Sequence, residues 1–67
     1  MARNYKRDYE ELPGFAKKYV GKAAIECIEA YAAKRKMVSH RAGSAFWELV
    51  DDGAISVTQI NGLYFIQ

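Results

Sequence analysis

The residues of this chain that could do chemistry are few, and their spacing does not suit catalysis. Ser39 and His40 are adjacent, and neighbours on a helix point in different directions, so they do not make the hydrogen-bonded pair that a serine nucleophile needs. Cys27 falls on a regular apolar stripe, as a buried and unreactive thiol does. Asp51-Asp52 fits the polar end of a helix better than an acid-base pair or a metal site. We therefore expect no catalytic residue and no enzyme.

Cofactor, metal and membrane signals are missing from the sequence as well. His40 is the only histidine and Cys27 the only cysteine, so no zinc-ligand set and no internal disulfide are possible. There is no glycine-rich loop of the phosphate-binding type and no apolar run near the roughly 18 residues of a membrane span. No signal peptide is visible. We expect no metal, no cofactor and no membrane, and a cytoplasmic location.

Charge is unevenly distributed along the chain. The net charge is only +2, yet all ten lysines and arginines fall at or before Arg41. Residues 1–41 carry ten bases and five acids, a balance of +5, whereas residues 42–67 carry three acids and no base, a balance of −3. This asymmetry predicts a surface that faces a polyanion, although an ordinary solvated helix face has the same pattern.

Pro13 and Gly21 divide the N-terminal half of the chain into segments. Residues 1–12 are rich in Arg, Lys, Tyr and Glu and are expected to form a basic arm with a short helical turn, because Asp8 and Glu11 have the spacing of a capping box. Pro13 disfavours helix at the residue before it and suits the first turn of a new helix. Pairs of apolar residues one turn apart then predict a helical segment over 13–36 with one buried face. Gly21 favours a bend that divides it into helices over 14–20 and 22–36.

A second helix and a hairpin follow. Ser39 is a good N-cap and Gly53 a good stop signal, which predicts a helix over 39–52. Asn61-Gly62 between two apolar runs is a strong hairpin signal, so residues 54–67 are expected to form two antiparallel strands. The sequence therefore predicts one α+β domain over residues 1–67, with two or three helices before a C-terminal β-hairpin.

The hairpin has apolar residues on both faces. A two-residue turn pairs Val57 with Ile66 and Ile60 with Leu63. Val57 and Ile66 then share the expected core side, and the other side presents a candidate protein-binding set of Ile60, Leu63 and Phe65. The last strand is expected to be an open edge that extends a partner's sheet or pairs with a second copy, as a homodimer.

Residues 30–66 resemble the second half of a winged helix-turn-helix DNA-binding domain. The matching residues are Ala33, Val38, Ser39, the run Leu49-Val50-Asp51-Asp52-Gly53, Ile55 and Asn61-Gly62-Leu63-Tyr64. Three features depart from the pattern: Met37 stands where a turn glycine is common, Gly43 stands where a branched apolar residue is usual, and the hairpin has no Lys or Arg. Any phosphate-binding bases must therefore come from the helices.

The resemblance implies a winged-helix-like regulator of transcription that binds double-stranded DNA. It implies that the start of the second helix enters the major groove, with Arg41 as the guanine reader, while lysines contact the backbone. The DNA-binding residues so implied are Ser39, His40, Arg41, Ser44, Lys34, Arg35, Lys36, Lys17, Lys18 and Lys22. The alternative is a small inhibitor or adaptor that binds protein through the apolar hairpin. The small size of the chain suggests a microbial or viral, phage-like setting for either function.

Overall fold

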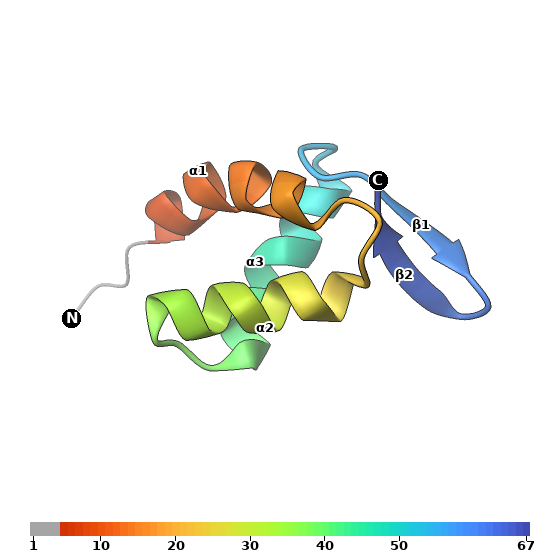
Figure 1. Cartoon of the computed structure of the whole chain (residues 1–67). Helices are drawn as coiled ribbons and strands as arrows, with labels where there is room; N and C mark the ends of the chain where they lie inside the picture. The colour runs from red at the N-terminus through yellow and green to blue at the C-terminus, as the bar shows by residue number, and fades with distance from the viewer. Residues whose placement is uncertain (1–4) are drawn as a thin grey trace.

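Six short elements follow one another in the computed structural model, which describes the chain from Tyr5 to Gln67 and its side chains from Lys6 (Figure 1). They are α1 (Tyr5–Ala16), the 3-10 turn η1 (Lys17–Tyr19), α2 (Ala24–Arg35), α3 (Ser39–Asp51), β1 (Val57–Ile60) and β2 (Leu63–Ile66). Helices α1 and α2 run in opposite directions, and α3 crosses behind them (Figure 1). The predicted α+β class, with three helices before an antiparallel hairpin, is confirmed.

The expected basic arm is largely helix. Residues 1–4 lie outside the described part of the chain, but residues 5–12 belong to α1, which continues through Pro13 to Ala16. The prediction that a new helix begins at Pro13 is therefore wrong. Asp8, Leu12 and Ala16 recur every four residues and are 1%, 0% and 2% exposed. Burying this stripe outweighs the cost of about 3 kcal/mol of a proline inside a helix.

The predicted bend at Gly21 is confirmed. The backbone there also pairs with the last strand, which the sequence did not predict. Gly21 has φ +87°, a value that side chains rarely allow, and α2 begins only at Ala24. The Gly21 N–H donates to Ile66 O over 2.7 Å, and the Ile66 N–H donates to Lys22 O over 3.0 Å. With an isolated bridge between Ala23 and Phe65, this stretch pairs with the second half of β2.

That pairing corrects the predicted open edge. Because residues 21–23 cover β2 near Phe65 and Ile66, the last strand is not a free edge over its second half. Within the described residues the outer edges of β1 and of the first half of β2 stay unpaired. The register itself is as predicted, since Val57 pairs with Ile66 and Ile60 with Leu63. Asn61 and Gly62 have φ of 53° and 82°, as a tight hairpin turn requires.

A three-residue turn joins α2 to α3. Lys36 adopts the left-handed conformation, with φ 56°, and the Met37 N–H donates to Ala32 O over 2.9 Å. The N-cap position of α3 is taken by Val38, with no side-chain cap, and Ser39 is the first helical residue. The prediction that Ser39 caps this helix is therefore wrong by one position.

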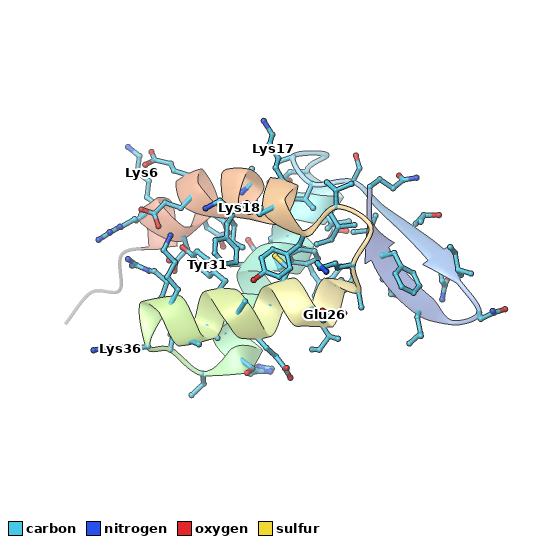
Figure 2. The ribbon with its side chains drawn as sticks, in the orientation of Figure 1. Lys6, Lys17, Lys18, Glu26, Tyr31 and Lys36 are labelled. Carbon is cyan, nitrogen blue, oxygen red and sulfur yellow. The ribbon has the colours of Figure 1, made fainter. Side chains whose placement is uncertain are left out.

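The core lies between the three helices and the base of the hairpin. Its fully buried side chains are Tyr31, Phe46, Leu12, Cys27 and Asp8, and Ile55 and Ile66 close it at the strand end. Figure 2 shows Tyr31 between α1 and α2. No helix in residues 5–67 is long and apolar enough to cross a membrane.

Candidate interaction surfaces

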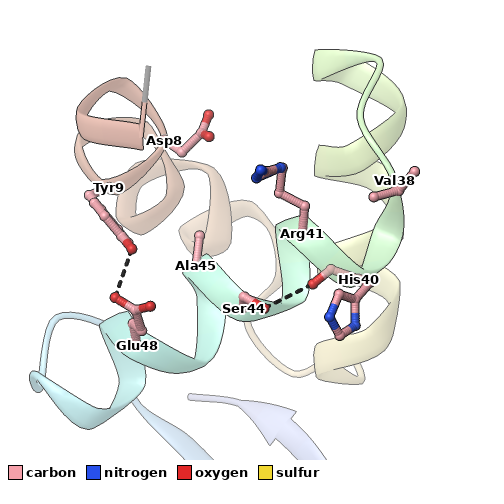
Figure 3. Close-up of a pocket in the computed structure, with 8 residues that line it drawn as sticks. All are labelled: Asp8, Tyr9, Val38, His40, Arg41, Ser44, Ala45 and Glu48. Carbon is pink, nitrogen blue, oxygen red and sulfur yellow. Dashed lines mark hydrogen bonds between the residues drawn. The ribbon is translucent and has the colours of Figure 1, made fainter. Parts of the chain in front are cut away.

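Only some of the residues at the start of α3 that were predicted to contact DNA bases are exposed to solvent. Ser39, His40 and Ser44 are exposed, and Ser44 Oγ donates to the His40 carbonyl oxygen over 3.1 Å. Arg41 is half-buried and lines a hollow of about 720 Å³ between α1 and α3, with its side chain turned toward α1 (Figure 3). His40 and Ser44 line the same hollow, and Arg41 is less exposed than either of them.

Arg35, a predicted phosphate contact, makes an internal ion pair. Its Nε lies 3.3 Å from Asp8 Oδ1 without the geometry of a hydrogen bond. The same carboxylate oxygen accepts a hydrogen bond of 2.9 Å from the Tyr31 hydroxyl. Burial and the contact with Asp8 raise the pKa of Tyr31 well above its usual value, so this hydroxyl stays protonated and donates. Arg35 therefore balances a buried charge and contributes little to the surface.

Two other predicted lysines converge on one aromatic ring. Lys18 Nζ lies 5.9 Å and Lys34 Nζ 5.2 Å from the centre of the Phe15 ring, within reach of cation–π attraction. The Phe15 ring also stacks on Tyr19 at 5.4 Å and meets the edge of Tyr31 at 5.3 Å. Both lysines remain exposed, so their charge is available to a ligand.

Two further exposed lysines are near this pair in the sequence. Lys17 points outward beside the end of α1 (Figure 2) and lines a hollow with the base of the hairpin. Lys22 is exposed too, and its backbone N–H donates to Tyr19 O over 2.9 Å. We call Lys17, Lys18, Lys22 and Lys34 the basic face. Lys34 helps to lower the pKa of Glu11, but the ion pair of this carboxylate, at 3.0 Å, is with Arg7. Glu11 therefore does not neutralise the lysines of the basic face.

The predicted DNA-binding residues do not form one surface. Lys34 comes nine positions after Ile25, about two and a half helical turns, so the two side chains leave α2 on opposite sides. Ile25 lines a hollow together with Ser39, His40 and Ser44. The start of α3 is therefore on one side of α2 and the Lys18–Lys34 pair on the other, whereas Lys36 is exposed at the end of α2 (Figure 2).

The predicted protein-binding residues differ in exposure. Ile60 and Leu63 are exposed, as expected, while Phe65 is half-buried beside the bridge to Ala23. Sequence reasoning missed Ile25, which lies off the apolar stripe of its helix and is more than half exposed. Tyr64 is partly exposed, and its ring packs on Trp47 at 5.1 Å.

Comparison of the chain with protein-family models, with curated proteins and with solved structures finds no match.

Proposed function

We propose that the protein binds double-stranded DNA through its basic face, as a small cytoplasmic regulator of transcription. The observation that carries this proposal is the meeting of Lys18 and Lys34 over the Phe15 ring. These lysines come from different elements, and the fold brings their charges to one place. Phosphate contacts from such lysines supply most of the affinity in non-specific binding to DNA.

The contact with Phe15 also favours binding. Attraction to the ring is worth about 0.5–1 kcal/mol at an exposed site and restrains a flexible lysine stem. Less side-chain entropy is then lost when the ammonium group meets a phosphate. Lys17 and Lys22 add two more exposed positive charges to the same part of the chain.

The resemblance to winged helix-turn-helix domains supports DNA as the ligand, since α2, a three-residue turn, α3 and a hairpin follow in the order it implies. We favour the basic face over the start of α3 for phosphate contact. Ser39, His40 and Ser44 offer hydroxyl and imidazole groups, but the one arginine beside them, Arg41, is half-buried and turned toward α1 (Figure 3). A surface with a single half-buried base has little of the charge that supplies most of the affinity for a polyanion.

Binding to a labelled duplex of random sequence, measured by fluorescence anisotropy across a salt series, tests the proposal. Four phosphate contacts predict a slope of about −3 to −4 for log affinity against log salt. Replacing both Lys18 and Lys34 by alanine should make the slope shallower by about 2.

The matched control replaces Lys6 and Lys36 by alanine, which removes the same charge at two exposed lysines outside the basic face (Figure 2). This variant should keep most of the slope. An equal loss in both variants would mean that binding follows net charge rather than the basic face, and no binding of the unaltered protein at low salt would overturn the proposal.

A further inference from the structure

Two adjoining hollows run between α2, α3 and the hairpin, on the side of α2 opposite to Lys34. One, of about 510 Å³, lies between α2 and α3, and the other, of about 190 Å³, is closed by the hairpin. Ile25, Ile28 and Trp47 line both. We call the continuous surface the apolar groove, and its principal residues are Ile25, Ile28, Gly43, Trp47, Leu63 and Tyr64.

Several large apolar side chains of the groove are exposed to solvent. Ile25, Leu63 and Tyr64 are 54%, 60% and 42% exposed. Contiguous exposed apolar surface of this kind marks an interaction site more often than scattered single residues do.

The walls of the groove are ordered by packing. The Trp47 ring meets Phe46 at 5.0 Å and Tyr64 at 5.1 Å, both in edge-on geometry, which holds the tryptophan between α3 and the hairpin. Gly43 has no side chain, which leaves a depression in the surface of α3 beside Ile28. A rigid aromatic wall next to a depression suits an inserted side chain.

Charge at the border of the groove indicates what it binds. No Lys, Arg, Asp or Glu lines either hollow, and the larger one includes His40. Glu29 is exposed one helical turn after Ile25, and Asp51 is exposed one turn after Trp47, so acids stand at the rim on both helices. Two bases are near in sequence: Lys22 just precedes Ala23 at the end of the groove, and Arg41 follows His40 but lines the hollow between α1 and α3 instead.

We propose that the apolar groove binds an amphipathic helix of a partner protein, with its apolar face in the groove and lysine or arginine along its flanks. A helix laid along α3 places anchors at positions i, i+3 or i+4, and i+7 into such a groove. Basic flanks complement Glu29 and Asp51. A second copy of this chain fits less well, because two-fold symmetry repeats the same acidic rim on both sides of the contact.

This inference is independent of DNA binding. Since the groove and the Lys18–Lys34 pair lie on opposite sides of α2, both surfaces can be occupied together. A groove variant such as Leu63→Asp should leave the salt slope for DNA unchanged, and the Lys18/Lys34 double variant should leave binding of the helix unchanged. Failure of either proposal can thus be told from failure of the other.

The test is a selection from a displayed library of stabilised helical peptides with randomised faces, followed by titration of the best peptide. Trp47 is the only tryptophan in the chain, so its fluorescence reports on the groove directly. Selected peptides should carry apolar residues at the stated spacing and an excess of Lys and Arg on the flanks. Binding should shift the Trp47 emission, and Leu63→Asp should weaken it by about tenfold or more.

Val20→Asp is the matched control, because Val20 is equally exposed and lines neither hollow. Ile25→Lys is a second groove variant that removes apolar surface with the opposite charge, and circular dichroism checks that each variant folds. Three results would overturn the proposal: no selected peptide that responds to Leu63→Asp and Ile25→Lys, selected peptides with acidic flanks, or a dimer of the protein alone that these variants dissociate.

Discussion

The Tyr31 hydroxyl donates a hydrogen bond to Asp8 Oδ1 over 2.9 Å and joins α2 to α1 inside the core. Arg35 Nε lies 3.3 Å from the same oxygen, so a buried carboxylate has both a hydroxyl donor and a positive charge beside it. Removing the Asp8 carboxylate leaves the Tyr31 hydroxyl and the Arg35 guanidinium without their shared partner. Removing the Tyr31 hydroxyl leaves the ion pair between Arg35 and Asp8 in place. The two losses should therefore differ in size.

Asp8→Ala should lower the free energy of unfolding by about 2–4 kcal/mol, because it strands a buried hydroxyl and a largely buried guanidinium. Tyr31→Phe should cost about 1–2 kcal/mol. Urea unfolding followed by circular dichroism measures both, with Glu10→Ala, an exposed acid in the same helix, as the control. A change below about 0.5 kcal/mol for Asp8→Ala would show that the network contributes nothing to stability.

Stability should fall in alkaline solution partly because of Tyr31. Burial, and then the hydrogen bond to Asp8, raise the pKa of the Tyr31 hydroxyl above its usual 10.0. Below pH 10 both states keep the proton and the stabilisation is complete; above it the unfolded chain loses the proton and the native state does not. The resulting decline is at most about 1.4 kcal/mol per pH unit.

Tyr31→Phe isolates this effect, since every other titrating group is retained. Unfolding free energies between pH 8 and pH 11 should converge for the two proteins as pH rises through this range. Parallel curves would show that Tyr31 ionises as easily in the native state as in the unfolded chain.

The Cys27 thiol should not react in the native protein. It is fully buried, and burial raises its pKa from 9.0 to about 11. At pH 8 only about one thiol in a thousand would be ionised, and that thiolate is shielded from reagents. Labelling with a disulfide reagent should therefore proceed only as fast as the protein opens, with the urea-unfolded protein as the reactive control. Labelling at the same rate in both states would contradict the burial of Cys27.

Gly43→Ala should stabilise the protein by about 0.5–1 kcal/mol. Gly43 lies inside α3, where alanine is the better helix former. Its added Cβ would lie 3.7 Å from Ile28 Cγ2, an ordinary van der Waals contact. Thermal unfolding measures the gain, and a loss would show that α2 and α3 approach more closely than this distance.

Gly21→Ala is the contrasting substitution. Gly21 has open space around it, but its φ of +87° strains any side-chain-bearing residue, so this change should destabilise by about 1–2 kcal/mol. If both glycine substitutions had the same sign, backbone conformation would not be what separates them.

Signals that depend on neighbouring residues predicted a large part of this fold. Asn61-Gly62 predicted both the hairpin and its register, because only residues that tolerate positive φ make such a turn. Apolar periodicity predicted the buried faces of α2 and α3, and Gly21 predicted the bend. Around Pro13 the local signal failed, because burial of Leu12 and Ala16 against other helices outweighs the preference of one residue.

The candidate sites could be predicted from the sequence less completely than the secondary structure could. The sequence showed which residues are basic and which are apolar, and hence the positive N-terminal part and the apolar hairpin. It did not show that Arg35 pairs with Asp8, nor that Ile25 joins Trp47 and Leu63 in one groove. These arrangements result from contacts between residues far apart in the chain. Such contacts depend on how the helices cross and which faces they bury, and no local pattern of residues encodes that geometry.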